Sequence, residues 1–546
     1  MMKSRVKKQF LGVFVGVSIL ISIGFQSNFF EVAKQIDIYT TLFKELNMYY
    51  IDEINPAELT EKSINHMLSS LDPYTRYYDE QGVEKARINS TGEYGGIGAV
   101  SHYKNKVLTI REILKNSPAE KSGIRPGDKI LKIDDVLVSD YEDSGVSSLL
   151  NGLPDTKVFV DVERQNKKLT IEIIRKKIEL SPVPHYAMLT EEVGYISFVK
   201  FNGKASSEVK KAFLELKDDG MKKLIIDVRS NPGGLLGEAV NISNFFVPKD
   251  KIIVTTKAKI EKWSDTFKTR NEPLDLEIPV VVLINNRSAS ASEILAGSLQ
   301  DYDRAVVIGE RSFGKGLVQR YRELTYGTQM KLTISKYYTP SGRCIQELDY
   351  TNRKGNDIPK FSDSGRKAYK TANGRTVFGG GGIMPDIEIK KPKTTKTTQA
   401  LFRSNAFFNY ATNYYYKNKS IASPEEFNLN TSEFNALTNY LKQHNSEFET
   451  SEELEFKKAL DKANENGVGE GVTSSYNTLL NSIQQEKLKE LAKNKEEITT
   501  KLTEEIVKRY YYSEGVYKQK AKFDKTILKA VEVLTNGKEY SKALKN

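Results

Sequence analysis

Residues 280–293 read VVVLINNRSASASE, an apolar run that passes directly into small polar residues. An apolar run of this length predicts a strand buried on both faces of an α/β sheet. Two other segments share the pattern: LIIDVRSNPGG at 224–234 and AVVIGERSFGKG at 305–316. Open α/β sheets place their active sites in the loops that follow such strands. We therefore expect these three loops to carry the chemistry.

The composition is typical of a multidomain globular protein, with 546 residues of which 39% are hydrophobic. The single cysteine, Cys344, excludes an intramolecular disulfide framework, and the four histidines lack the spacing of a zinc site. We expect no metal and no cofactor. The net charge is +11, but the lysines are interleaved with glutamates, as between Glu486 and Lys501, and form no basic stripe. We expect no nucleic-acid partner.

The N-terminus has the layout of an export signal. Four basic residues precede the uncharged residues 10–25: Lys3, Arg5, Lys7 and Lys8. The apolar stretch is short for a membrane span of about 20 residues, and no clear A-x-A cleavage site follows it. A cleaved signal peptide and an uncleaved membrane anchor therefore both remain open for residues 1–27. Either one predicts an exported protein, periplasmic or anchored to the inner membrane and facing the periplasm.

Hydrophobic periodicity divides the rest of the chain. Helical spacing continues to residue 71, and a β-rich module then opens at Gly96-Ile97-Gly98 and includes SPAEKSGIRPGD at 117–128, a short helix followed by a turn. We expect five regions: a signal peptide or anchor (1–27), a helical segment (28–90), a β-rich domain (91–176), an α/β core (177–392) and a mostly α-helical C-terminal extension (393–546).

The loop after residue 227 contains Gly233 and Gly234, and adjacent glycines let backbone N–H groups point at a bound oxygen. An ordinary strand-to-helix turn is the simpler alternative. Arg229 is expected to brace this loop.

The loop at 285–293 carries three serines that alternate with alanines at the start of a helical pattern. Small residues allow a substrate to approach closely, and the helix dipole favours developing negative charge. Ser290 and Glu293 also fit a capping box, which would explain one serine but not three.

The loop at 309–316 resembles a nucleotide-binding P-loop, but Gly316 stands where the magnesium-binding hydroxyl belongs. Ser312 and Lys315 match an S-x-x-K motif without its helix or its companion motifs. No histidine lies in the three loops, so the residues favour a serine nucleophile with a lysine base. Such a lysine must be neutral, so its pKa of about 10.4 has to fall through burial. Gln319, four residues further on, is expected on the same side of a strand, where its amide would orient the amine.

At this point the chain resembles the C-terminal processing peptidases, also called tail-specific proteases, which are exported serine proteases with an inserted PDZ domain. The Gly-Ile-Gly loop and residues 117–128 match the PDZ module. Three stretches match the protease core: Asn-Pro-Gly-Gly, Ser-Ala-Ser-Ala-Ser-Glu and Phe-Gly-Lys-Gly-x-x-Gln. The resemblance implies a ClpP/crotonase-like α/β core and covers about residues 36–389, so the C-terminal extension falls outside it.

The resemblance also implies roles for individual residues, by motif position. Ser290 is the nucleophile, Lys315 the base and Gln319 the residue that positions the lysine. Ala291 and one of Gly233 or Gly234 donate to the oxyanion, and the choice between the two glycines stays open.

The implied function is an exported endopeptidase that cuts proteins near their C-termini and whose PDZ domain binds the free carboxylate through Gly96, Ile97 and Gly98. Its partners are proteins with accessible C-terminal tails, with a homo-oligomer or an adaptor also open. A catalytically silent PDZ scaffold for exported proteins is the alternative. The sequence identifies neither the substrates nor the task of the C-terminal extension.

Overall fold

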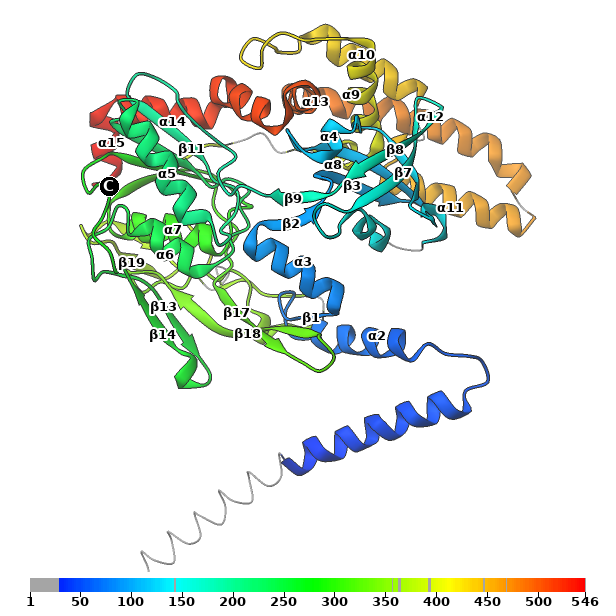
Figure 1. Ribbon diagram of the computed structural model, residues 1–546, viewed down its shortest axis with the longest axis horizontal. Helices are drawn as coiled ribbons and strands as arrows, with labels where there is room; N and C mark the ends of the chain where they lie inside the picture. Colours follow the sequence, from blue (N-terminus) through cyan, green and yellow to red (C-terminus); the bar gives the residue numbers. More distant parts are fainter. Residues whose placement is uncertain are drawn as a thin grey trace, which may run out of the picture. The chain divides into compact units, whose positions relative to one another are not determined.

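The computed structural model describes residues 29–545 except 142, 143, 356, 362–364, 391–393, 445, 446 and 468 (Figure 1). The predicted export segment, 1–27, lies outside the described residues. The chain divides into two compact units, one formed by the residues up to Tyr78 with 321–332 and the other by the remainder. Among the described residues, no helix combines the length and the apolar character that a membrane crossing requires.

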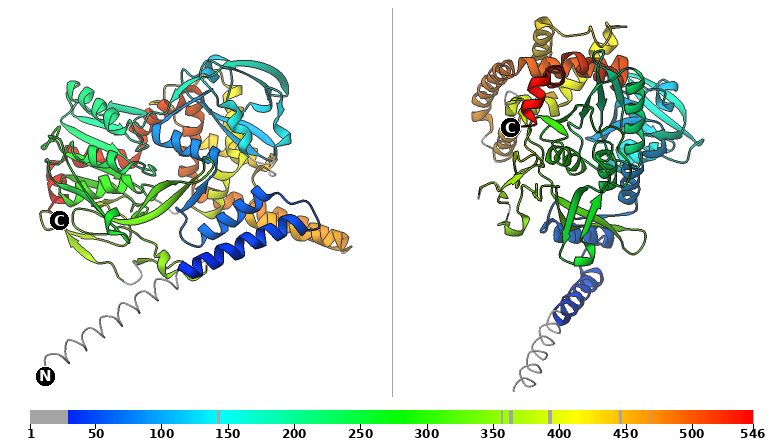
Figure 2. Two further views of the ribbon diagram at one scale, coloured as in Figure 1. Left: turned by 60° about the horizontal axis from the view of Figure 1, so that its bottom comes forward. Right: turned by 90° about the vertical axis from the view of Figure 1, so that its left-hand side faces the viewer.

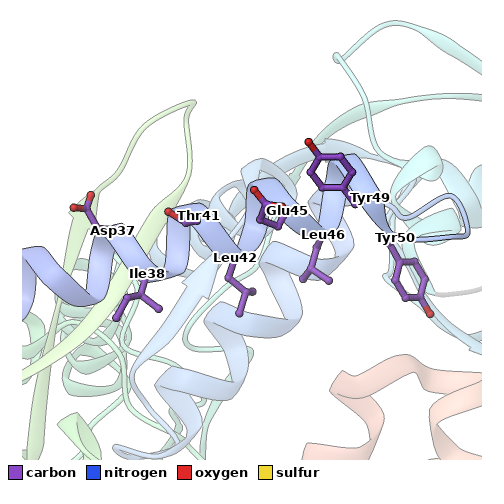
Figure 3. Close-up of a pocket in the computed structure, with 8 residues that line it drawn as sticks. All are labelled: Asp37, Ile38, Thr41, Leu42, Glu45, Leu46, Tyr49 and Tyr50. Carbon is purple, nitrogen blue, oxygen red and sulfur yellow. The ribbon is translucent and has the colours of Figure 1, made fainter.

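The smaller unit is mainly helical, as predicted for the N-terminal segment. Residues 29–49 form a helix, α2 (Pro56–Ser69) follows, and β1 (Arg76–Tyr78) pairs antiparallel with residues 329–331. Asn55 caps α2, accepting hydrogen bonds from the first backbone N–H groups of the helix. Figure 3 shows Ile38, Leu42 and Leu46 along an open groove of the first helix.

The larger unit is built around a six-stranded sheet in the order β10-β11-β12-β15-β16-β21. All neighbouring pairs are parallel except β10 with β11. The bounds are β10 (His185–Met188), β11 (Val193–Ser197), β12 (Lys223–Asp227), β15 (Val280–Ile284), β16 (Ala305–Gly309) and β21 (Ile387–Glu388). The three apolar runs predicted as strands are therefore neighbours, and their following loops leave the same edge of the sheet.

Helices cover both faces of this sheet. One face packs on α5 (Ala205–Asp218), α6 (Leu236–Ser243) and α7 (Ala291–Asp301). The other face packs on α14 (Lys525–Thr535), through Ile527, Ala530 and Leu534, and on α15 (Gly537–Ala543). Figure 2 shows these last helices, in red, beside the green strands of the sheet in both views. The end of the C-terminal extension is thus part of the α/β core.

A smaller β layer lies beside the main sheet. Its strand β13 (Ile252–Ala258) pairs with β14 (Asp265–Lys268) and with residues 335–338 of β18 (Gln329–Tyr338). β17 (Leu317–Glu323) pairs with β18. A separate hairpin joins β19 (Ala368–Lys370) to β20 (Thr376–Phe378).

The β-rich module forms its own sheet around a separate apolar core. Its order is β3-β4-β5-β7-β8, with β6 on β5. The bounds are β3 (Ala99–Lys104), β4 (Val107–Ile113), β5 (Lys129–Ile133), β6 (Val136–Leu137), β7 (Lys157–Arg164) and β8 (Lys167–Ile174), with the short helix α4 (Pro118–Lys121). Antiparallel pairing of β2 (Glu93–Gly96) with β9 (Lys176–Glu179) closes the point where the chain enters and leaves. α3 (Glu80–Thr91) precedes the module.

The C-terminal extension is helical, as predicted, and its first helices surround a third apolar core. They are α8 (Lys396–Arg403), α9 (Asn405–Lys417), α10 (Thr431–Gln443), α11 (Ser451–Glu465), α12 (Gly469–Lys493) and α13 (Lys495–Phe523). Helix α13 is kinked at Tyr512, whose φ is 57°.

Helix α13 contacts the β-rich module at its kink. The Tyr512 hydroxyl donates to Glu120, Ser513 donates to Glu112, and the Lys115 ammonium lies 2.9 Å from the Glu514 carboxylate. From there the helix runs on to α14 behind the core sheet (Figure 1). One helix therefore touches both the module and the core.

Candidate active site

The three predicted loops meet at the carboxyl edge of the parallel sheet. The Phe313 N–H donates to the Ser288 carbonyl at 3.0 Å, and the Ala289 N–H donates to the Asn231 carbonyl at 3.1 Å. Backbone hydrogen bonds thus join the serine loop to both of its neighbours. The site sits where an open α/β sheet is expected to bind its substrate.

Ser290 is the N-cap residue of α7 and has a strained backbone. Its φ of 57° and ψ of −114° lie outside the regions that a residue with a side chain normally occupies. Its carbonyl accepts hydrogen bonds from Glu293, Ile294 and the buried hydroxyl of Tyr337. Ser290 is partly exposed at the edge of the sheet, so its position suits a nucleophile that has to reach a substrate.

The other two serines of the loop are buried and bonded to backbone carbonyls. Ser288 Oγ donates to the Val228 carbonyl at 2.8 Å, and Ser292 Oγ donates to the Asn231 carbonyl at 2.9 Å. Both side chains are fully inaccessible to solvent. Their role is to attach the serine loop to the glycine loop.

Glu293 makes more hydrogen bonds in the site than the sequence predicted. The capping box anticipated its contact with Ser290, and its carboxylate does accept the Ser290 N–H at 2.8 Å. The same carboxylate also accepts hydrogen bonds from Ser312 Oγ at 2.6 Å, Gly314 N at 2.7 Å and Lys315 N at 2.9 Å. Burial raises the pKa of Glu293, and these four donors oppose that rise.

Lys315 lies in the loop between β16 and β17, and its backbone is held on both sides. Besides its own bond to Glu293, the next N–H, that of Gly316, donates to Gln346 Oε1 at 2.8 Å. The Lys315 residue is half-buried. The loop therefore presents the lysine from a fixed backbone beside the serine loop.

Gln319 is in β17, and its Nε2 donates to Thr333 Oγ1 at 3.2 Å. The expectation that Lys315 and Gln319 share one side of a strand is wrong, because β17 begins only at Leu317. Strand alternation therefore does not relate the two side chains.

Neighbouring atoms lie so close to both glycines of the first loop that a side chain would not fit at either position. A Cβ on Gly233 would lie 2.8 Å from the Ala291 nitrogen and 3.0 Å from the Ser290 Cβ, and one on Gly234 would lie 2.1 Å from the Phe201 carbonyl oxygen. Their φ values of 90° and 153° also favour glycine. The glycine loop thus lies directly against the start of α7.

The N–H groups of the two glycines differ in their partners. The Gly233 N–H donates to Asn231 Oδ1 at 2.9 Å. Gly234 and Phe201 form a parallel bridge, in which the Phe201 N–H donates to the Gly233 carbonyl and the Leu235 N–H donates to the Phe201 carbonyl. The Gly234 N–H therefore points away from Phe201. Within the described part of the chain, the N–H groups of Gly234 and Ala291 donate to no acceptor.

Arg229 braces the glycine loop, as expected, but it does so with a partner that the sequence did not reveal. Its guanidinium binds Asp227, the last residue of β12, and also both carboxylate oxygens of Asp524 at 2.9 Å. Asp524 belongs to the C-terminal extension, 295 residues away along the chain. The only local sign of Asp524 is its position as the N-cap of α14.

The Gly96-Ile97-Gly98 loop lies at the start of the β-rich module's sheet. The Ile97 carbonyl accepts the Ala119 N–H, and the Gly98 carbonyl accepts the Leu114 N–H. Gly98 has a φ of 74° and approaches Ser117 closely. The N–H groups of Ile97 and Gly98 have no acceptor among the described residues, as a site for a carboxylate requires.

In the ranges that the structure describes, no three or more His, Cys, Asp and Glu side chains come together in a group that could hold a metal ion.

Comparisons with known proteins match three parts of the chain to family models. Residues 192–351 match Peptidase family S41, residues 95–174 match the PDZ domain, and residues 397–534 match the C-terminal helical domain of probable PDZ-proteases.

Individual relatives extend over more than half of the chain. A probable CtpA-like serine protease of Staphylococcus haemolyticus is 34% identical over 347 residues, 61% of this chain and 69% of its own length. Its counterpart in Staphylococcus aureus strain MRSA252 is 35% identical over 325 residues, 59% of this chain. The match spans 64% of that relative's length. A solved photosystem II D1 C-terminal processing protease is 27% identical, with a TM-score of 0.35, over 64% of this chain and 86% of that one.

Proposed function

The chain belongs to the CtpA-like C-terminal processing peptidases of family S41, and from this premise we propose that it is an exported serine endopeptidase that cleaves proteins near their C-termini. The arrangement that carries the proposal is a single buried carboxylate, that of Glu293, which holds the backbones of both Ser290 and Lys315. The order of strands and helices supports a ClpP/crotonase-like core.

In the proposed reaction Ser290 Oγ attacks the carbonyl carbon of the scissile peptide bond while Lys315 Nζ accepts its proton. The C–N bond then breaks, the leaving amine takes the proton from Lys315, and an ester joins the substrate to Ser290. Water, deprotonated by Lys315, hydrolyses the ester and restores the serine hydroxyl. Gln319 is assigned the role of positioning the lysine.

The developing oxyanion needs two N–H donors. Ala291 is favoured because it follows the nucleophile at the first position of α7, where an N–H has no partner within the helix. Of the two glycines, Gly234 is favoured because the Gly233 N–H is already bonded to Asn231. The helix dipole adds to the stabilisation.

The substrate tail is assigned to the PDZ domain. Gly96, Ile97 and Gly98 would bind the terminal carboxylate through backbone N–H groups, while the upstream chain reaches the serine. Protein substrates with accessible C-termini are the proposed partners, and self-association or an adaptor would be compatible with this arrangement.

Export is proposed from the basic and apolar layout of residues 1–27 alone, to the periplasm or to the periplasmic face of the inner membrane. A reporter that is active only outside the cytoplasm, fused after residue 90, tests this, and activity confined to the cytoplasm would reject it.

Two measurements on the full chain test the enzyme proposal. A fluorophosphonate should label the wild-type protein and not the Ser290→Ala variant, and a comparison of C-terminal peptides with and without active protein should reveal new protein ends. A PDZ scaffold without activity would gather the same proteins but give no labelling and no new ends.

A further inference from the structure

A buried arginine joins the C-terminal extension to the loop that carries the glycines. Arg229 Nη2 donates to Asp227 Oδ2 at 2.7 Å, and its Nη1 donates to both oxygens of Asp524 at 2.9 Å. Asp227 also accepts the hydroxyl of Tyr195 at 2.9 Å. The guanidinium thus spans two carboxylates that come from distant parts of the chain.

Both carboxylates are needed to keep this charge buried. The Arg229 side chain is 11% exposed, and the Asp227 and Asp524 side chains are 8% and 22% exposed. Burial alone would lower the pKa of Arg229, but the two carboxylates raise it well above its ordinary value. Burial would raise the pKa of Asp524, but Arg229, together with the backbone N–H groups of Ile527 and Thr526, holds that pKa below its ordinary value. Removing one partner would leave a buried charge undercompensated.

Arg229 is also the point at which the glycine loop departs from β12. Its own N–H donates to Asp227 Oδ1 at 3.0 Å, and the next residue, Ser230, has a φ of 60° and donates to Asn285 Oδ1. Asn231 follows and bonds the Gly233 N–H. The direction in which the chain leaves the strand, and so the position of the glycines, depends on where the guanidinium is held.

We propose that Asp524 is a positioning residue for the oxyanion loop, which it holds through Arg229, so that the C-terminal extension contributes to catalysis by way of this loop. The inference rests on the proposed function. The loop has to place an N–H group within hydrogen-bond distance of a developing oxyanion, and a misplacement of about 1 Å can cost about 100-fold in rate. Asp524 touches no reacting atom, so its effect has to appear in kcat.

Asp524 has a second role that the experiment must separate from the first. It caps α14, accepting hydrogen bonds from the N–H groups of Thr526 and Ile527 at 2.8 and 3.1 Å. Asparagine is as good an N-cap as aspartate. Asp524→Asn therefore keeps the cap, and it removes the charge and one of the two oxygen acceptors that face Arg229.

The test measures kcat, KM and the apparent melting temperature of the full chain with a C-terminal peptide substrate. We expect Asp524→Asn to lower kcat about 10- to 100-fold with KM changed less than about 2-fold. The matched control is Glu453→Gln, which breaks the buried Glu453–Lys487 pair in the same extension; Lys487 lies over the ring of Phe448, which belongs to a separate apolar core. Its kcat should stay at the wild-type value even if its melting temperature falls further.

A double-mutant cycle tests the route through Arg229. If Asp524 acts only through this arginine, Arg229→Gln with Asp524→Asn should have the same kcat as Arg229→Gln alone. Arg229→Lys keeps the buried positive charge but lacks the planar guanidinium that binds both carboxylates. This variant replaces Asp524→Asn in the test if the asparagine variant does not fold. It should also lose kcat.

The outcomes separate this inference from the proposed function. A wild-type protein without fluorophosphonate labelling or cleavage would reject the function itself. An active wild type with an equally active Asp524→Asn variant would overturn only the positioning role. Equal losses of kcat in Asp524→Asn and Glu453→Gln would also overturn it, since they would reflect general destabilisation.

Discussion

The backbone N–H groups of Ser290 and Lys315 donate to one and the same oxygen atom, Oε2 of Glu293, at 2.8 and 2.9 Å. The two residues come from different loops, and a buried carboxylate on α7 sets the distance between their backbones. The proposed Ser290–Lys315 dyad is therefore preorganised by a group to which the proposed mechanism gives no part in proton transfer. Such preorganisation lowers the cost of bringing a nucleophile and its base together.

Replacement of Glu293 by glutamine should strongly reduce activity without removing a reacting group. The amide keeps the shape, but its NH₂ group would face N–H donors where an oxygen now accepts their hydrogen bonds. We expect kcat/KM to fall about 100-fold.

The matched control is Ser312→Ala, which removes one of the four donors and leaves both Ser290 and Lys315 bonded to the carboxylate. It should keep most of its activity. An active Glu293→Gln enzyme would show that the shared carboxylate does not organise the dyad.

Replacement of each of the three serines by alanine should affect turnover and stability differently. Ser290→Ala should abolish turnover and leave the melting temperature near that of the wild type. Ser288→Ala should stay active but lose about 1–3 kcal/mol of stability, because the Val228 carbonyl and the Asn285 N–H each lose a buried partner. Ser292→Ala should cost about 1 kcal/mol and also retain turnover. Full proteolysis by Ser290→Ala, with loss in either neighbour, would reassign the nucleophile.

Lys315→Ala should be as inactive as Ser290→Ala, because no group would then accept the serine proton. Lys315→Arg should not restore activity, since a guanidinium does not lose its proton in a protein. Burst kinetics with an activated ester would measure acylation directly. A measurable burst with the arginine variant would remove the lysine from the role of base.

The contribution of Asp524 to stability should depend on pH with a definite sign. Its pKa is lower in the folded state than the ordinary value of about 3.9, so the folded state binds its proton less readily than the unfolded chain. The stabilisation is present above about pH 4 and is lost as the pH falls through the lowered pKa. The gap in melting temperature between wild type and Asp524→Asn should therefore be widest near neutral pH and narrow below about pH 4. A gap that stays constant to pH 3 would contradict the ionic role.

Amidation of a substrate's C-terminus should slow cleavage if the PDZ loop binds the carboxylate, while a short nonspecific peptide should be affected less. Gly98→Ala should reproduce the loss, because its Cβ would lie 2.5 Å from the Ser117 Cβ at a φ of 74°. Gly471→Ala is the control, since a Cβ there meets no neighbour within 4 Å. Equal slowing of tailed and tailless substrates would mean that the loop does not select tails.

The sequence predicted those features that depend on local patterns. The apolar run at 280–284 predicted a buried strand, and the alternating serines indicated more than an ordinary N-cap at the start of a helix. Alternation failed for Lys315 and Gln319 because the beginning of a strand after a glycine-rich loop is set by pairing with β18. The Arg229–Asp524 pair could not be predicted, since 295 residues separate two residue types that are abundant throughout the chain. The kink of α13 at Tyr512 could not be predicted either, because neither glycine nor proline occupies that position.

The position of α14 on the back of the core sheet has a consequence for the timing of activity. A ribosome releases the strands β10 to β21 well before residues 525–535, and at about 5–20 residues per second the interval is on the order of ten seconds. During that interval one apolar face of the sheet is bare and Arg229 lacks its second carboxylate. The nascent chain therefore carries Ser290, Lys315 and the Glu293 that joins them before it carries Asp524, so under the proposed positioning role its full activity has to wait for the C-terminal extension.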